Sequence, residues 1–314
     1  MPEWWIERGI GETRFALIDD GEIVETRVLV DGVVPAGTVL AAALKRSGRP
    51  AVAVAGETEY LLPQGAPGVS EGSACAIEIT REAIAGPEPW KRPLARVTGD
   101  EPHPAQLPNG ETLALPSPED RMAHAGWGDL IEEARSGTVA FEGGALRLSP
   151  TPAMTLIDVD GTLAAADLAL AGARAAVRAI LRHDIGGSIG IDLPTLDGKA
   201  ARKRVDDAID AALPKPFERT AVNGFGFVQI VRPRRHASLL ELAQDRAAFE
   251  ARALLRRAAF EPAGAKTLVA HPRVAAVIDA HPDWLSALSR QVGGPVRLRA
   301  DPALTMSGGH AEPS

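Results

Sequence analysis

The chain has 314 residues, which is long enough for two or three domains of ordinary size. Its 45% hydrophobic and 24% charged residues are typical of a folded globular protein and exclude a disordered or fibrous chain. A single cysteine, Cys75, excludes an internal disulfide and a thiolate metal cluster, and it favours a reducing compartment. The first residues lack a basic start and an apolar run, and no stretch reaches the ~20 apolar residues of a membrane span. We therefore expect a cytoplasmic protein that does not enter a membrane.

The net charge of −7 disfavours a nucleic-acid partner, because phosphate binding requires lysine and arginine. The distribution of charge changes this picture, since acidic residues are scattered whereas cations gather in two groups. These groups are Lys199, Arg202, Lys203 and Arg204, and Arg232, Arg234, Arg235 and His236. Each group taken alone is equally compatible with a solvated surface and with phosphate contacts.

In chain order, residues 4–31 predict a β-hairpin whose turn is Asp19-Asp20-Gly21. Residues 37–97 then contain the short runs VLAAAL, AVAVAG, EYLLP, ACAIEI and LARVTG, separated by glycine, proline and serine. This spacing predicts a small five-stranded barrel. Residues 98–118 contain five prolines and little periodicity, so we expect a linker there.

The second half of the chain predicts an α/β layer. A helix over 119–135 leads to two strands joined at Gly143-Gly144. Buried strands in MTLIDV and GGSIGIDL then alternate with helices over 163–182 and 198–213, and FGFVQIV is the third strand. A helix over 238–260, the strand KTLVAH, two short helices and the strand VRLRA form a further α/β piece.

Two aspartates end the two buried strands of this layer. Asp158 closes MTLIDV and Asp192 closes GGSIGIDL, and one helix joins the strands. A right-handed crossover makes the strands parallel neighbours, so their carboxyl ends, where open α/β sheets bind ligands, come together. Paired carboxylates repel each other unless a cation lies between them, and such ligands suit Mg²⁺ or Mn²⁺, with Asp160 as a supporting ligand. The alternative is that each aspartate caps the following helix, which is the commoner role of a lone strand-end aspartate.

The two cationic groups follow the same strands. Lys199 and Lys203 follow the Asp192 strand, and Arg232 and Arg234 follow the third strand. We expect both groups on the rim that carries the aspartates, where they would hold the phosphates of a polyanion beside a catalytic metal.

Three segments of this half resemble successive blocks of the deoxyribonuclease-I-like catalytic subdomain of the ribonuclease E/G family: GGALRLSPTPAMTLIDVDG, HDIGGSIGIDLPTL and NGFGFVQIVRPR. The similarity extends outward in the same order. The opening hairpin resembles the start of the split ribonuclease-H-like subdomain, and residues 37–97 resemble the inserted OB-type RNA-binding barrel. KTLVAHPRVAAVI and VGGPVRLRAD resemble the family's carboxy-terminal small domain.

The resemblance implies an α/β protein with a deoxyribonuclease-I-like and ribonuclease-H-like catalytic part and an inserted barrel. The implied segments are the opening hairpin 1–35, the barrel 36–97, a linker with a short helix 98–137, the catalytic part 138–242 and the carboxy-terminal part 243–314. Asp158 and Asp192 fall on the family's metal-binding catalytic aspartates, and Asp160 on a position that is usually asparagine. The implied reaction is endonucleolytic hydrolysis of single-stranded RNA to 5′-phosphate products, in RNA processing or decay, with Mg²⁺ activating the water.

The chain departs from the family at several positions. Gly224 stands where the family usually has an arginine before Phe-Gly, which implies the loss of a phosphate or transition-state contact. Ala51 and Leu61 replace aromatic residues that stack on bases in the family's barrel, and Tyr60 is the candidate substitute. The zinc-binding CPxC segment is absent, so no zinc-linked tetramer is expected and a homodimer is left open. These departures favour a second interpretation, an RNA-binding relative with little or no catalysis.

A third interpretation rests on the segment DVDGTL at 158–163, which matches the nucleophile motif of haloacid-dehalogenase-type phosphatases. There Asp158 would attack phosphorus and Asp160 would act as the general acid. That family needs a later strand ending in a paired acidic metal site, which we do not find after Lys199, and it leaves the predicted barrel unexplained.

Overall fold

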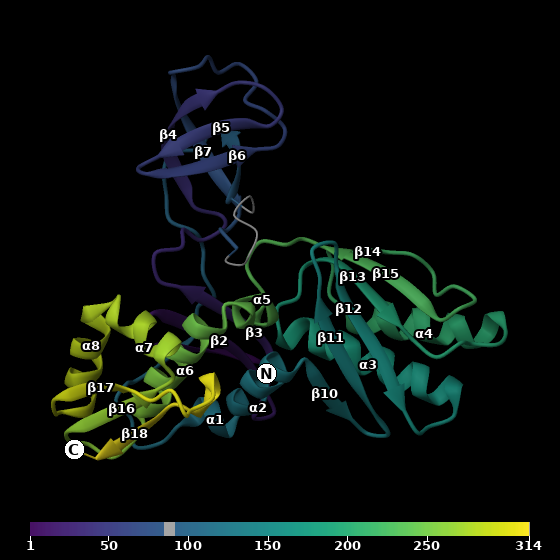
Figure 1. The fold of residues 1–314 in the computed structure, drawn as a ribbon. Coiled ribbons are helices and arrows are strands. Elements are labelled where there is room, and N and C mark those ends of the chain that lie inside the picture. Colours follow the sequence, from purple (N-terminus) through teal and green to yellow (C-terminus); the bar gives the residue numbers. More distant parts are fainter. Residues whose placement is uncertain (85–91, 314) are drawn as a thin grey trace. The chain divides into compact units, whose positions relative to one another are not determined.

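The structure is a computed structural model that describes residues 1–84 and 92–313 (Figure 1). It is a mixed α/β protein. The chain divides into two compact units. Unit 1 comprises Met1–Gly32, Pro108–Gly128 and Leu242–Ser314, and unit 2 comprises Val33–Leu107 and Asp129–Glu241.

Unit 1 begins with a four-stranded sheet in the order β3-β2-β1-β9. Its strands are β1 (Glu3–Arg8), β2 (Glu12–Asp19), β3 (Glu22–Val30) and β9 (Glu111–Leu113). The predicted hairpin turn is confirmed, because Asp20 and Gly21 join β2 to β3 with φ of 49° and 82°. β9 pairs with β1 in parallel although the whole barrel segment separates them in sequence. The barrel is therefore inserted between two neighbouring strands of one sheet.

The predicted helix over 119–135 is two helices, α1 (Arg121–His124) and α2 (Trp127–Ser136). Gly126, with φ of 101°, interrupts the helical backbone between them. The predicted helix over 238–260 is also divided, into α5 (Leu239–Gln244) and α6 (Arg246–Ala259). Here the side chain of Asp245 accepts a hydrogen bond from the N–H of Ala248 and so starts a new helix.

The carboxy-terminal part of unit 1 is a small three-stranded sheet in the order β17-β16-β18, covered by helices. Its elements are β16 (Lys266–Ala270), α7 (Pro272–Asp279), α8 (Pro282–Val292), β17 (Val296–Ala300), a 3₁₀ turn at Met306–Gly308 and β18 (His310–Pro313). Leu254, Leu255, Leu268, Ile278 and Leu288 form the centre of its apolar core, each at most 1% exposed. The predicted strands and two short helices are present, and β18 was not expected.

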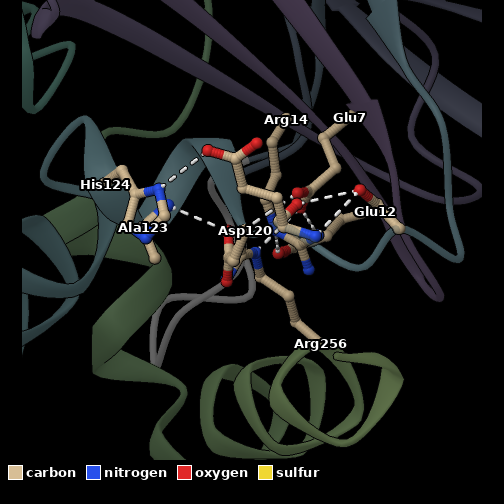
Figure 2. A network of polar contacts seen from close by, with 9 residues as sticks. Glu7, Glu12, Arg14, Asp120, Ala123, His124 and Arg256 are labelled. Atoms are coloured by element: carbon tan, nitrogen blue, oxygen red, sulfur yellow. Dashed lines mark hydrogen bonds and ion pairs between the residues drawn. The ribbon is translucent and has the colours of Figure 1, made fainter. Parts of the chain in front are cut away.

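A buried ionic network ties the strands of unit 1 to α6 (Figure 2). Arg14 donates to Glu7 and to Glu12, at 2.7 Å in both cases. Arg256 contacts both carboxylate oxygens of Glu7, at 2.8 and 3.0 Å, and forms a second two-point contact with Asp120. Arg252 completes the network by donating to Glu12 at 2.7 Å. Three arginines thus balance three carboxylates, which is the condition for burying charges at tolerable cost.

In unit 2, five strands form the closed barrel β4-β5-β6-β8-β7. They are β4 (Val39–Arg46), β5 (Ala51–Ala55), β6 (Thr58–Leu62), β7 (Ala74–Arg81) and β8 (Leu94–Thr98). Leu44, Leu62, Ile77 and Ile79 fill its interior, each at most 1% exposed. The prediction of a five-stranded barrel is confirmed. Residues 85–91, which fall inside the predicted segment 36–97, lie outside the described residues.

The second part of unit 2 is a six-stranded sheet in the order β10-β11-β12-β13-β15-β14. The strands are β10 (Thr138–Phe141), β11 (Gly144–Pro150), β12 (Thr155–Gly161), β13 (Gly187–Asp192), β14 (Glu218–Arg219) and β15 (Phe227–Arg232). β12 and β13 are parallel, and the other neighbouring strands are antiparallel. Helix α3 (Ala165–Arg182) packs on β10, β11 and β12, and α4 (Lys199–Ala212) packs beside α3.

Alternation along the strands separates the two faces of this sheet. Ile157, Val159, Ile189, Ile191, Val228 and Ile230 are at most 5% exposed on the face beneath α3 and α4. We call the opposite face the open face. It carries Arg147, Leu156, Asp158, Asp160, Asp192, Phe227, Gln229 and Val231, all of them at least partly exposed.

In the part of the chain that the structure describes, no helix combines the length and the apolar character needed to cross a membrane.

Candidate functional site

The two predicted catalytic aspartates are register partners. Asp158 on β12 lies directly beside Asp192 on β13 in the parallel pairing of these strands. Because residues paired in this way project to the same side, both carboxylates lie on the open face, and both are exposed. The prediction that two strand ends bring these residues together therefore agrees with the strand register.

The local sequence explains why the carboxylates point away from the helices. In the segment TLIDVDG of β12, Ile157 and Val159 are buried under α3 while Asp158 and Asp160 are exposed. Gly172 of α3 allows this close packing, because a Cβ at this position would lie 2.3 Å from Val159 Cγ1. A shift of one residue in the register of β12 would bury both aspartates, so the apolar positions fix the acidic ones.

The surroundings of Asp158 disfavour its charged form. Partial loss of hydration raises the pKa of Asp158 above its ordinary value, and the negative charges of Asp160 and Asp192 raise it further. The positive charge of Arg147 and a hydrogen bond from the Val159 backbone act in the opposite direction. A bound cation would favour the charged form in the same way as Arg147 does.

Arg147 is a cation of this site that the sequence reasoning missed. It lies on β11 directly opposite Asp158, yet its Nε is 3.6 Å from Oδ2 of Asp160. The alternation in GGALRLS could have identified it, because Leu146 and Leu148 are buried and the residue between them must face outward.

The donor set suits a magnesium-like ion. Two carboxylates from neighbouring strands would leave the other coordination positions to water and substrate phosphate, which is how Mg²⁺ is usually held. Among residues 1–84 and 92–313, no three acidic, histidine or cysteine side chains gather closely enough to hold a metal ion by themselves. Asp158 and Asp192 are the two carboxylates that the register brings together for such an ion, and their role as ligands, like the supporting role of Asp160 beside Arg147, stays a prediction.

The first cationic group lies at the same end of the sheet as the carboxylates. Helix α4 begins at Lys199, a short loop after the end of β13 at Asp192, and Lys199 is exposed. Lys203, one turn further, forms an exposed ion pair with Asp207 at 2.8 Å. Arg202 donates to the carbonyl of Leu196 at 3.0 Å and so holds the loop that leads into α4.

The second cationic group is not on this rim, and that expectation is wrong. β15 runs antiparallel to β13, so Phe227 lies beside Asp192 whereas Arg232 lies beside Gly187, at the opposite end. Arg232 donates to the carbonyl of Ile185 at 3.0 Å, and Arg234 is paired with Glu241. Their proposed contact with phosphates held at the aspartates is therefore not supported.

Tyr60 is not available for base stacking, which corrects a second expectation. Its side chain is 1% exposed and belongs to the apolar interior of the barrel. Burial also raises the pKa of its hydroxyl. Stacking requires an exposed ring face, so Tyr60 does not replace the aromatic residues missing at Ala51 and Leu61.

Phe225 is a further residue that sequence reasoning did not assign to the site, although the resemblance had singled out its neighbour Gly224. Both residues lie in the turn Asn223–Phe227. It connects to β15 beside Asp192, and Phe225 at its tip is 83% exposed. The signal was present in the sequence NGFGF, because asparagine and glycine are typical of turns and turns run over the protein surface.

No protein-family model matches the chain, and no curated protein matches it either.

Proposed function

We propose that this chain is a metal-dependent endoribonuclease, related to the ribonuclease E/G family, that hydrolyses single-stranded RNA to 5′-phosphate products in RNA processing or decay. The observation that carries the proposal is the pairing of Asp158 with Asp192 on the open face of the sheet. Both carboxylates would hold Mg²⁺ or Mn²⁺. The site lies on the exposed open face, at the carboxyl ends of two central strands, where a long flexible polyanion can reach it.

The aspartates would bind the metal, and the cations near them would contact the RNA. Asp158 and Asp192 bind and place the metal, which when bound would polarise a phosphoryl oxygen and lower the pKa of a water. Arg147, whose Nε lies 3.6 Å from Oδ2 of Asp160, would reduce the repulsion between the acidic face and the RNA. Lys199 and Lys203, at the same end of the sheet, would contact neighbouring phosphates.

The barrel also supports a nucleic-acid role. Its order β4-β5-β6-β8-β7, with β6 and β8 in parallel contact, is consistent with an OB-type fold. Its insertion between β3 and β9 agrees with the order of segments in the ribonuclease E/G family. Single-stranded RNA is the partner we propose, in the cytoplasm, with no zinc-linked assembly.

A second candidate function is RNA binding with little or no hydrolysis. Gly224 favours it, because the turn next to Asp192 lacks the arginine that the family usually has there. The phosphatase interpretation has less support, since β15 brings Phe227 rather than an acidic residue beside Asp192.

The experiment is cleavage of an end-labelled single-stranded RNA in Mg²⁺ or EDTA. Wild type is compared with Asp158→Asn, Asp192→Asn and, as a matched control, Asp197→Asn in the exposed loop after β13. We expect Mg²⁺-dependent cleavage that only the first two substitutions abolish. RNA binding without cleavage in wild type would establish the second candidate, and hydrolysis of only p-nitrophenyl phosphate would establish the phosphatase.

A further inference from the structure

Phe225 is an exposed residue at the tip of a turn that the Asn223 side chain closes by hydrogen bonds. The side chain of Asn223 accepts hydrogen bonds from the N–H groups of Phe225 and Phe227, at 2.9 and 3.1 Å. Gly226 has φ of 92°, and a Cβ there would lie 2.2 Å from the carbonyl oxygen of Leu193. The turn therefore packs against the backbone that follows β13, and the Phe225 side chain at its tip is 83% exposed.

Phe227 provides a second ring at the same edge. It faces the open side of the sheet, and its ring lies over Gly190 of β13: a Cβ at Gly190 would be 2.7 Å from Phe227 Cζ. Leu156 of β12 borders the same glycine, at 3.1 Å by the same measure, and is 37% exposed. Because position 190 has no side chain, Phe227 and Leu156 form an apolar surface over it on the open face.

This aromatic edge adjoins the carboxylate pair. Phe227 is the register partner of Asp192, and Asp192 is the register partner of Asp158. The three side chains occupy one row across β12, β13 and β15 on one face. A phosphodiester held at the aspartates would therefore have its neighbouring base within reach of the two rings.

We propose that Phe225 and Phe227 form a stacking platform for a nucleobase next to the phosphodiester that the Asp158–Asp192 pair addresses. This inference rests on the proposed function, and it names the part of the substrate that the site recognises. The hydrogen bonds from Asn223 fix the backbone that carries Phe225, and a phenyl side chain has only two rotatable bonds, so stacking on a base costs little conformational entropy. Stacking accepts any base, so the platform would give affinity with little sequence preference. It would also compensate for the absence of exposed barrel aromatics at Ala51, Tyr60 and Leu61.

The test is equilibrium binding in EDTA, where no cleavage occurs, of fluorescein-labelled oligouridylate and of an abasic oligomer with the same backbone. Phe225→Ala should weaken binding of oligouridylate by about 5- to 100-fold and leave binding of the abasic oligomer unchanged. Phe225→Trp should retain the affinity. Gly190→Ala, which would displace the far end of the Phe227 ring and crowd the end of the Leu156 side chain, should weaken binding in the same base-dependent way. Val231→Ala is the matched control, because Val231 is 49% exposed on the same face at the other end of β15.

Equal binding by Phe225→Ala and wild type would overturn the proposal, as would an equal loss on the abasic oligomer or an absence of RNA binding by wild type. The proposed function fails separately. If wild type binds RNA through Phe225 but does not cut it in Mg²⁺, the platform stands and the nuclease does not. If wild type cuts RNA and Phe225→Ala binds and cuts like it, only the platform is lost.

Discussion

Asp158 and Asp192 are paired in register on two parallel strands, and both point away from the helices that cover the sheet. Like charges that face each other on neighbouring strands destabilise a sheet. The consequence is visible at Asp158, whose pKa is raised by partial loss of hydration and then by Asp160 and Asp192. We therefore expect this repulsion to lower the stability of the metal-free protein and a bound cation to relieve it.

This repulsion predicts that Asp158→Asn stabilises the metal-free protein. A raised pKa in the folded state means that the stabilising contribution of Asp158 is present below its ordinary value of 3.8 and is lost as the pH rises through the folded value. At pH 7 the substitution should raise the free energy of unfolding by about 0.5 kcal/mol, and near pH 3 it should have no benefit. Urea unfolding in EDTA at both pH values measures this. A destabilised Asp158→Asn protein at pH 7 would contradict the prediction.

Magnesium should make wild type more stable than Asp158→Asn, which reverses their order in EDTA. Wild type should gain about 2.7 kcal/mol at a Mg²⁺ concentration 100 times the dissociation constant, because only the folded state pairs the two carboxylates. Asp158→Asn should gain much less, whereas Asp197→Asn should behave like wild type. Thermal unfolding over a Mg²⁺ titration gives the comparison, and an equal gain in all three proteins would show that the ion binds elsewhere.

Gly224→Arg should strengthen the site. A Cβ at Gly224 would meet no other atom within 4 Å, and its backbone lies outside the left-handed region, so a side chain fits. An arginine there would place a cation on the turn beside Asp192 and should raise kcat/KM for RNA cleavage by about 10- to 100-fold. Gly224→Met controls for side-chain volume. The same kcat/KM in Gly224→Arg and wild type would show that this turn does not contact the substrate.

Sequence patterns predicted the parts of the site that depend on local alternation. The strands TLIDVDG and GGSIGID place their apolar residues under the helices, so the outward position of both aspartates follows from period-two alternation. The same alternation predicts that Tyr60 shares the inner face of β6 with Leu62. The expected stacking role of Tyr60 did not take this alternation into account, and the structure contradicts it. The five barrel strands were recognisable because glycine and proline separate them.

Strand direction was not predictable in this way. The segment FGFVQIV alternates identically in either direction, so the pattern does not reveal that β15 runs antiparallel and carries Arg232 away from Asp192. The pairing of Arg256 with Glu7 was equally hidden, because these residues are 249 positions apart and each alone is typical of a surface.

Removing a carboxylate from the buried network should lower the free energy of unfolding far more than removing one from a surface ion pair of similar geometry. Glu7→Gln leaves Arg14 and Arg256 without their shared carboxylate and should lower the free energy of unfolding by about 3 kcal/mol. Glu111→Gln breaks a two-point contact with Arg121 that is partly exposed, and it should cost less than about 1 kcal/mol. The double variant Glu7→Gln with Arg256→Met should lose less than the sum of its single changes, since the two residues share one interaction. Denaturant unfolding decides this, and equal losses at Glu7 and Glu111 would contradict the structural role of burial.

The contribution of Glu12 to the free energy of unfolding should fall as the pH falls, whereas that of Asp158 should fall as the pH rises. Burial alone would raise the pKa of Glu12, but Arg14 and Arg252 outweigh burial and hold it below its ordinary value of 4.5. A lowered pKa in the folded state contributes stability above 4.5 that is lost as the pH falls through the folded value. Asp31 acts against this, because burial and the charges of Glu12 and Asp283 raise its pKa.

The lowered pKa of Glu12 predicts that Glu12→Gln costs about 2 kcal/mol at pH 7 and that the difference from wild type shrinks below pH 4.5. The exposed Glu22→Gln is the control, and a difference that stayed constant down to pH 3 would mean that the charge of Glu12 does not stabilise the fold.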